Sequence, residues 1–330
     1  MIKIKNLSKK YKVIKKEPGL RGAIKALYNP KYELVHAVNN INFSISEGEI
    51  VGYIGSNGAG KSTTIKMMSG ILTPDDGEIL VNGIIPYKNR KKNAQQVGAV
   101  FGQRTQLYWD IPIRESFELL KHIYAIPEEE YNKNLNHFIE ILNLNDLLDK
   151  PVRQLSLGQK MRCELASCFL HNPKIVYLDE PTIGLDVSVK EKIRDFISYI
   201  NQKKKTTIIL TTHDMQDIEV LCNRVIIIDK GAIIYDGDIK NLKNNSQYNR
   251  VIEMEIENIE DNFIYPSEFE GLVEYEIRTN SIKVHYNNTK VSSQTILLNF
   301  MNKYEISDFT ITEPDIGRVV QDIYNGSAEQ

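Results

Sequence analysis

The sequence predicts an α/β fold built around a phosphate-binding loop, followed by a small α+β domain. Up to about residue 240, strand-like apolar runs alternate with helical segments, which is typical of a mostly parallel sheet with helices on both faces. The stretch GSNGAGKST at 55–63 fits the phosphate-loop pattern G-x-x-x-x-G-K-[ST]. After an Asn-rich stretch, which we interpret as a linker at 241–249, short strands and helices follow. We therefore expect a large domain at 1–240 and a small accessory domain at 241–330.

Two strands are expected before the loop. Apolar and polar residues alternate at the start of 1–11, which predicts an edge strand, and 36–46 predicts a second strand. Between them, the insertion 14–34 carries several basic residues and has apolar residues at helical spacing. This pattern is typical either of a basic amphipathic helix on a membrane or partner, or of a surface helix packed on its own domain.

The phosphate loop itself follows the apolar run 49–54 and precedes a helical run at 63–68. Glycines lack a Cβ, so the backbone can turn its N–H groups inward, and the helix N-terminus adds partial positive charge. Lys61 supplies a cation for the β- and γ-phosphates, and the Ser62 hydroxyl suits a Mg²⁺ ligand. We expect the loop to bind nucleotide through Gly55, Ser56, Asn57, Gly58, Ala59, Gly60, Lys61, Ser62 and Thr63.

Alternating strands and helices continue after the loop. A hairpin is expected at 75–86 because glycines mark its turns, and a strand at 95–103 that ends at Gln103. Prolines separate the helical segments of a subdomain at about 104–172. The expected elements that follow are helices at 114–125, 128–148, 155–173, 188–202 and 215–222, strands at 174–180 and 206–214, and a hairpin at 224–238.

The small C-terminal domain is predicted from period-two alternation and short helical runs. Its length of about 90 residues is enough for a modest core of its own. The expected elements are strands at 251–258 and 306–312, a hairpin at 273–286 and helices at 293–304 and 314–325.

Composition excludes several classes of protein. Hydrophobic residues make up 42% of the 330 residues and charged residues 25%, as in ordinary globular proteins. The net charge of −2 gives no bulk attraction to nucleic acid, so we expect no nucleic-acid partner. No apolar run approaches the roughly 18 residues of a membrane span, so any membrane role requires a partner. The three cysteines have no disulfide spacing and are expected to be buried thiols.

Two consecutive carboxylates end the apolar run 175–178. In phosphate-loop ATPases, an Asp at the end of such a Walker B strand holds Mg²⁺, which assigns Asp179 as a metal ligand. The next residue, Glu180, lies near the attacking water and is a candidate general base.

The order of motifs resembles the ATP-binding cassette (ABC) ATPases over about residues 1–240. The matching elements are the phosphate loop, Gln103, LSLGQ at 155–159, YLDEP at 177–181, GLD at 184–186 and His213. Leu157 stands where the usual family signature has Gly. The stretches VFGQRTQLYWDIP and LSLGQKMRCEL further resemble a subgroup of multidrug-type exporter ATPases that act with separate permeases.

The resemblance implies that two copies bind head to tail and enclose ATP and Mg²⁺. It implies that Ser156, Gly158 and Gln159 of one copy contact the nucleotide of the other. Asp186, which is grouped with these nucleotide-site residues, would contact the loop of the opposite copy. His213 would contact the γ-phosphate and hold Glu180, while Gln103 would ligate Mg²⁺ and sense the permease. Tyr11 would stack on adenine, with Tyr28 and His36 as rivals for this role.

We therefore interpret the chain as the ATP-hydrolysing subunit of an ABC exporter at the cytoplasmic face of the cell membrane, attached through permease subunits. One alternative is a soluble ABC ATPase that acts on ribosomes or DNA. Another is a polysaccharide exporter whose C-terminal domain binds a sugar or lipid carrier. Trp109, the only tryptophan, is either a permease anchor or a core residue.

Overall fold

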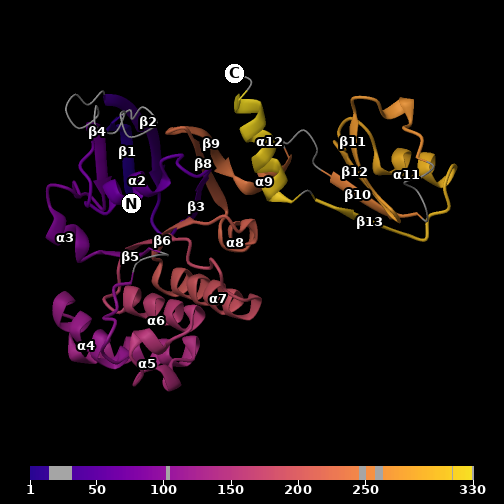
Figure 1. Cartoon of the computed structure of the whole chain (residues 1–330). Coiled ribbons are helices and arrows are strands. Elements are labelled where there is room, and N and C mark those ends of the chain that lie inside the picture. Colours follow the sequence, from indigo (N-terminus) through magenta and orange to yellow (C-terminus); the bar gives the residue numbers. More distant parts are fainter. Residues whose placement is uncertain (15–31, 102–104, 245–249, 257–262, 314, 329–330) are drawn as a thin grey trace, which may run out of the picture. The chain divides into compact units, whose positions relative to one another are not determined.

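The computed structural model describes residues 1–14, 32–101, 105–244, 250–256, 263–313 and 315–328 (Figure 1). The chain forms two compact units, Met1–Asp236 and Gly237–Gln330, which are described separately. Among the described residues, none of the helices combines the length and the apolar character needed to cross a membrane. The three cysteines, all of which lie in the described ranges, are buried and free.

The first unit is organised around a six-stranded sheet with the order β5-β6-β7-β3-β8-β9. The pairs β5·β6, β6·β7, β3·β7 and β3·β8 are all parallel. Because β3 lies between β7 and β8, the end of β3 and the ends of its neighbours meet at one edge of the sheet. The strands are β3 Ile50–Gly55, β5 Val97–Phe101, β6 Ile175–Asp179, β7 Thr207–Thr211, β8 Arg224–Asp229 and β9 Ala232–Asp238.

A second sheet of three antiparallel strands has the order β2-β1-β4. Its strands are β1 Ile2–Ile14, β2 Tyr32–Ile45 and β4 Asp76–Val81. The expected edge position of the first strand is wrong, because Ile2 pairs with both Ile45 and Val81. Alternation in a sequence reveals one buried face but not whether a strand has one neighbour or two.

The expected hairpin at 75–86 is also wrong. Its first half is β4, which pairs with β1, and the turn after it closes only through an isolated bridge between Val81 and Ile84. The glycines therefore mark turns correctly, but the partner strand comes from the N-terminus of the chain.

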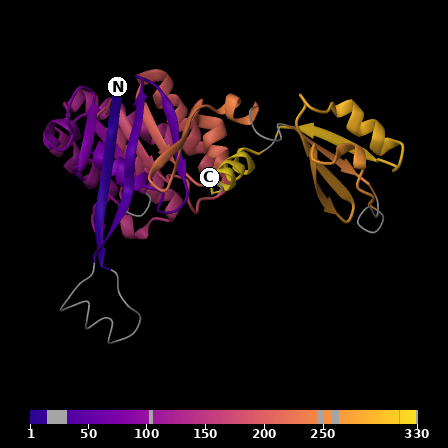
Figure 2. The same cartoon turned by 90° about the horizontal axis from the view of Figure 1, so that it is seen from above.

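β1 and β2 run together beyond the other strands as a two-stranded ribbon (Figure 2). Near its tip, Val13, Tyr32 and Leu34 are exposed. The helix expected within the insertion 14–34 falls largely on residues 15–31, which lie outside the described part of the chain.

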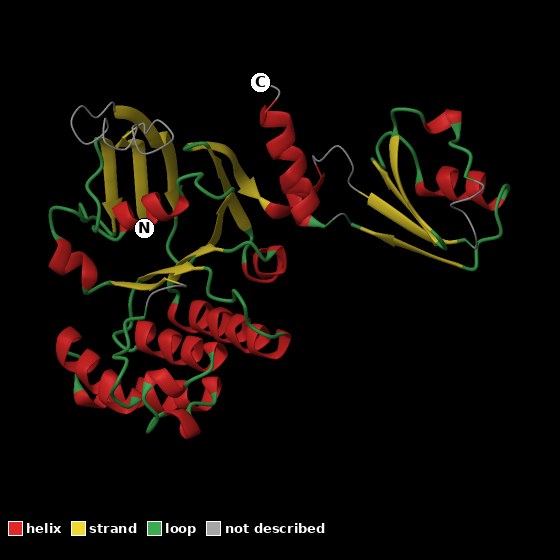
Figure 3. Ribbon diagram, in the orientation of Figure 1, coloured by secondary structure: helices red, strands yellow, loops and turns green. Residues whose placement is uncertain are grey.

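Helices α4 to α7 gather on one side of strands β5 and β6 (Figure 3). Edge-to-face contacts of Phe196 on α7 with Phe138 on α5 and Phe169 on α6 join three of these helices through one aromatic core. The helices of this unit are α2 Lys61–Met68, α3 Arg90–Ala94, α4 Ile113–Tyr124, α5 Glu128–Leu142, α6 Leu157–Phe169, α7 Val187–Lys204 and α8 Met215–Leu221, with short 3₁₀ turns η1 Asn145–Leu147 and η2 Val152–Gln154.

The second unit contains a four-stranded antiparallel sheet with the order β11-β12-β10-β13. Its own core includes Ile252, Val284 and Phe300. Part of the expected linker is helical instead, because α9 Ile239–Asn244 extends into it. The other elements are β10 Arg250–Glu255, η3 Ser267–Phe269, β11 Val273–Arg278, β12 Ser281–Tyr286, α11 Ser293–Met301, β13 Asp308–Thr312 and α12 Ile316–Ala328.

Candidate functional site

The loop between β3 and α2 has a backbone that only glycine allows at two positions. Gly60 caps α2 with φ +111°, and a Cβ there would lie 2.3 Å from the carbonyl oxygen of Ala37. A Cβ on Gly55 would lie 2.3 Å from the carbonyl oxygen of Ile228 on the neighbouring strand β8. The loop can therefore curl tightly at the start of α2, where free N–H groups and the helix dipole favour an anion.

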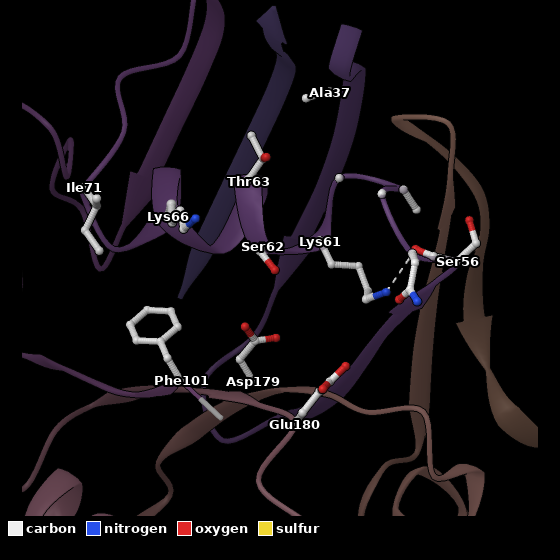
Figure 4. Close-up of a pocket in the computed structure, with 14 residues that line it drawn as sticks. Ala37, Ser56, Lys61, Ser62, Thr63, Lys66, Ile71, Phe101, Asp179 and Glu180 are labelled. Atoms are coloured by element: carbon white, nitrogen blue, oxygen red, sulfur yellow. Dashed lines mark hydrogen bonds between the residues drawn. The ribbon is translucent and has the colours of Figure 1, made fainter. Parts of the chain in front are cut away.

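A pocket of about 480 Å³ lies over this loop (Figure 4). Its wall contains every loop residue from Ser56 to Thr63, together with Asp179 and Glu180 from the end of β6. Gly55 is not among the lining residues, and its carbonyl accepts a hydrogen bond of 2.5 Å from Lys61 Nζ. The other lining residues are Ala37, Lys66, Ile71 and Phe101.

Lys61 is buried, and its Nζ also donates to the carbonyl of Ser56 at 3.1 Å. Burial lowers the pKa of Lys61, while the charges of Glu180 and Asp179 oppose that shift. The ammonium group thus lies in the pocket with two carboxylates close enough to affect it.

The two carboxylates are held by the next strand of the sheet. Asp179 pairs with Thr211, whose hydroxyl donates to Asp179 Oδ1. The N–H of Glu180 donates to the carbonyl of Thr211 at 2.9 Å, and Glu180 Oε1 lies 3.0 Å from His213 Nε2. Glu180 has φ +56°, a conformation that costs energy for a residue with a Cβ and that is concentrated at functional sites.

The chemistry of the pocket fits Mg²⁺ bound together with phosphates. The Ser62 hydroxyl and the Asp179 carboxylate both point into the pocket (Figure 4). Mg²⁺ prefers oxygen ligands and is usually held by one or two protein groups, substrate phosphates and waters. Gln103, the third expected ligand, lies outside the described residues.

The expected signature residues Ser156, Gly158 and Gln159 are not among the residues that line this pocket. Ser156 is the N-cap of α6, and Gln159 completes a capping box with it, with hydrogen bonds of 3.0 and 3.3 Å. Asp186 likewise caps α7 and accepts from Val189 N at 2.9 Å. This hydrogen bond lowers the pKa of Asp186.

Tyr11 and His36 are also not among the residues that line this pocket. Tyr11 lies on β1 opposite Val35 with 38% of its surface exposed, and Lys9 Nζ is 5.9 Å from its ring. His36 is exposed, and Tyr28 lies outside the described residues. The role of Tyr11 stays a prediction.

Trp109 is not a core residue. Its side chain is 56% exposed, and Lys160 Nζ lies 5.8 Å from the ring centroid. This exposure removes the core alternative and leaves the indole available for a partner.

Comparison with known proteins identifies the family. Residues 38–183 match the ABC transporter family. The ABC transporter ATP-binding protein NatA of Bacillus subtilis (strain 168) is 31% identical over 215 residues, which cover 65% of this chain and 87% of NatA. The chain belongs to the family of ABC transporter ATP-binding proteins.

Other ABC relatives agree with the fold and the activity. A structure of the dimeric ATP-binding cassette MJ0796 with ADP and Pi has a TM-score of 0.60 at 27% identity and covers 72% of this chain and 99% of that one. The methionine import ATP-binding protein MetN of Geobacillus kaustophilus (strain HTA426) is 36% identical and covers 67% of this chain. The chain spans 66% of the length of that relative. The fold is that of ABC ATPases, as expected, and the chain is an ATPase.

This ABC subunit also has a buried carboxylate on α8 that its sequence did not predict. Asp217 is 0% exposed and accepts hydrogen bonds from Thr182 Oγ1 and Thr212 Oγ1, the second at 3.1 Å. Arg194 Nε on α7 donates to it at 2.6 Å. Asp217 thus connects the loop after Glu180 with the loop that carries His213. An aspartate in a short amphipathic helix gives little signal of this role in a sequence.

Proposed function

We propose that the chain is the ATP-hydrolysing subunit of an ABC exporter, and that two copies act head to tail on separate membrane permease subunits. The main observation in support of this proposal is that the expected ATP-binding residues of one copy do not all lie in the same pocket. The phosphate loop and the two carboxylates share one pocket, while Ser156 and Gly158 do not line it. A second copy would supply them.

Within one copy, the proposed roles follow from the contacts. Lys61 and the loop N–H groups would bind the phosphates, and Ser62, Asp179 and Gln103 would hold Mg²⁺. The ion supplies charge neutralisation for phosphoryl transfer. Glu180 would accept a proton from the attacking water or orient it, and His213 would fix the Glu180 carboxylate through the 3.0 Å contact.

The exporter direction rests on the resemblance of two stretches, of which one contains Trp109 and the other includes the start of α6. The relative MetN is named for import, so the direction must be measured in this system. Permease subunits would place the chain at the cytoplasmic face of the membrane, and the exposed Trp109 is the residue we propose to contact them.

Complementation between two inactive variants tests the head-to-tail arrangement. Lys61→Ala disables the phosphate loop. Gly158→Asp places a negative charge in the signature, where a Cβ would meet Val189 only at 3.4 Å. If the signature acts on the other copy, random mixing of the two variants restores about a quarter of wild-type activity, because half of the dimers carry one intact site. A mixture with no recovered activity would show that each copy works alone.

Two further experiments test the transporter assignment. The tagged chain is expected to co-purify with a multi-spanning membrane protein from detergent-solubilised membranes of its host. Recovery of ribosomal proteins or nucleic acid instead would favour a soluble ABC ATPase.

Once the permease is identified, vesicle transport assays measure the direction of transport. ATP-dependent uptake into inside-out vesicles is expected for an exporter, whereas uptake into right-side-out vesicles would establish import.

A further inference from the structure

A buried carboxylate on helix α6 accepts hydrogen bonds from Thr105 and Gln106, which follow β5 in the sequence. Glu164 lies on α6 and is only 3% exposed. The hydroxyl of Thr105 donates to Glu164 Oε1, and the backbone N–H of Gln106 donates to Glu164 Oε2 at 3.3 Å. A buried carboxylate is costly unless it is hydrogen-bonded, so these contacts tie the segment to the helix specifically.

Further contacts hold the same segment against α6 and the turn before it. Lys160, one helical turn before Glu164, lies 5.8 Å from the ring centroid of Trp109. Arg153 donates its backbone N–H to the carbonyl of Trp109 at 3.2 Å and its guanidinium to Asp110 at 3.0 Å. The Arg153–Asp110 pair is exposed and is expected to contribute little. The buried contacts of Glu164 are therefore the strongest attachment.

The position of α6 makes this attachment relevant to catalysis. α6 begins directly after Ser156, the signature residue that we propose to reach the nucleotide of the second copy. The attached segment begins with Thr105, two positions after the expected Mg²⁺ ligand Gln103. Glu164 itself is not part of the nucleotide pocket.

We propose that Glu164 is a positioning residue for ATP hydrolysis. By accepting hydrogen bonds from Thr105 and Gln106, it fixes the position of α6, so that Ser156 at the start of this helix is placed correctly for the nucleotide of the second copy. The inference deepens the proposed function, because it uses the signature helix of one copy at the site of the other. Nucleotide binding within one copy does not depend on it.

The test measures kcat, KM and nucleotide affinity of the purified full-length chain. Because small misplacements of catalytic groups are costly, Glu164→Ala is expected to lower kcat by about 10- to 100-fold. The affinity for a fluorescent ATP analogue should stay within about twofold, since the pocket is unchanged. Thr105→Val, which removes only the hydroxyl, is expected to lower kcat in the same direction, whereas Thr105→Ser should retain activity.

A double-mutant cycle separates positioning from simple packing. If the two residues act as one clamp, Glu164→Ala combined with Thr105→Val is no slower than Glu164→Ala alone. Ser167→Ala is the matched control, because Ser167 is a buried polar residue of the same helix whose hydroxyl bonds only to the Glu164 carbonyl in the contacts described. This control should leave kcat unchanged.

Several outcomes would overturn the proposal. Equal kcat in Thr105→Val and Thr105→Ser would show that the hydroxyl contact has no catalytic role. If the effects of Glu164→Ala and Thr105→Val on kcat simply add in the double variant, Glu164 contributes to packing alone. The same conclusion follows if Glu164→Ala lowers the melting temperature but leaves kcat at 25 °C unchanged. If Glu164→Ala does not fold, the kcat values of Thr105→Val and Thr105→Ser still test whether the hydroxyl contact matters for catalysis. Failure of the trans-complementation assay with a normal Glu164 effect would instead refute the head-to-tail dimer.

Discussion

Among the individual residues of the site, Glu180 is held by contacts of both its backbone and its side chain. Its backbone adopts φ +56° and donates to Thr211, while its carboxylate meets His213 at 3.0 Å. A left-handed conformation at a residue with a Cβ costs about 1–3 kcal/mol and persists only where surrounding contacts enforce it. The strained backbone of Glu180 places its side chain in the lining of the pocket, and this position, not local stability, explains the conformation.

Glu180→Gln tests the role of that carboxylate. The amide preserves size but cannot accept a proton, so kcat should fall by about 10²–10⁴-fold if Glu180 is the general base. Nucleotide affinity should be retained, and ATP should trap a dimer that is visible by light scattering. The measurement is steady-state phosphate release beside ATP-analogue binding. Unchanged turnover would remove Glu180 from the catalytic role.

At the scale of elements, a buried ion pair between Arg194 on α7 and Asp217 on α8 joins these two helices. Asp217 also contacts the two loops that follow Glu180 and β7. Arg194 and Asp217 are both buried, and Asp217 also accepts from the hydroxyls of Thr182 and Thr212. Buried pairs of this kind add little net stability compared with apolar packing, but loss of one partner leaves an uncompensated charge. They therefore act mainly to specify one arrangement of the helices and loops.

Asp217→Ala is expected to destabilise the first unit by about 3–5 kcal/mol, because Arg194 then remains buried without its closest acceptor. Urea unfolding followed by circular dichroism measures this change. The matched control is Asp195→Ala, an exposed position on α7, which should change stability by no more than about 0.5 kcal/mol. A loss of less than about 1 kcal/mol at Asp217 would contradict the proposed importance of the pair.

A histidine after α6 makes the helical region sensitive to acid. His171 stacks on Tyr124 with ring centroids 3.9 Å apart, its Nε2 contacts the carbonyl of Val97 at 3.2 Å, and its buried Nδ1 has no hydrogen-bond partner among the described residues. Burial lowers the pKa of His171 from 6.5 to about 4. Between these pH values the unfolded chain binds a proton that the folded chain does not, so stability falls as the pH falls.

His171→Gln should remove this acid sensitivity, since the amide can donate to Val97 but does not titrate. Going from pH 8 to pH 5, the wild type is expected to lose up to about 2 kcal/mol more stability than the variant. Urea unfolding at both pH values measures the difference. The exposed His122 provides the control, and His122→Gln should leave the pH dependence unaltered. Equal losses in wild type and His171→Gln would refute the assignment.

At the scale of the whole molecule, each of the two compact units has buried apolar residues that pack into a core of its own. All the described residues that line the pocket over the phosphate loop belong to the first unit, Met1–Asp236. Each unit has its own sheets, which is the usual mark of a part that folds alone.

A chain truncated after Asp236 should therefore fold and bind ATP with an affinity within about twofold of the full chain. Thermal unfolding and titration with a fluorescent ATP analogue measure these properties. Any loss of dimerisation or of permease binding in the truncated chain, with ATP affinity retained, would assign those functions to Gly237–Gln330. An unfolded truncation product would show that the first unit requires the second.

Much of the site could be predicted because its residues are contiguous. The phosphate loop and the Asp179–Glu180 pair each follow an apolar strand, and the requirement for glycine at Gly55 and Gly60 is local to the chain. Strand order was less predictable, since the alternation of 1–11 does not reveal that β1 has neighbours on both sides. The network around Asp217 was not predicted, because its partners come from three separate segments.

The α/β class, the family resemblance and the position of the glycine-rich loop could all be predicted from the amino-acid sequence, because each depends on short patterns of residue type and spacing. The tertiary structure was needed to show that Trp109 is exposed and that Thr105 donates to the buried Glu164. It also separated Ser156 from the pocket of its own chain. Contacts between residues that are far apart in the sequence depend on which strands are neighbours and on which buried polar groups pair with one another. No single stretch of the sequence contains this information, so these contacts could not be predicted from local patterns.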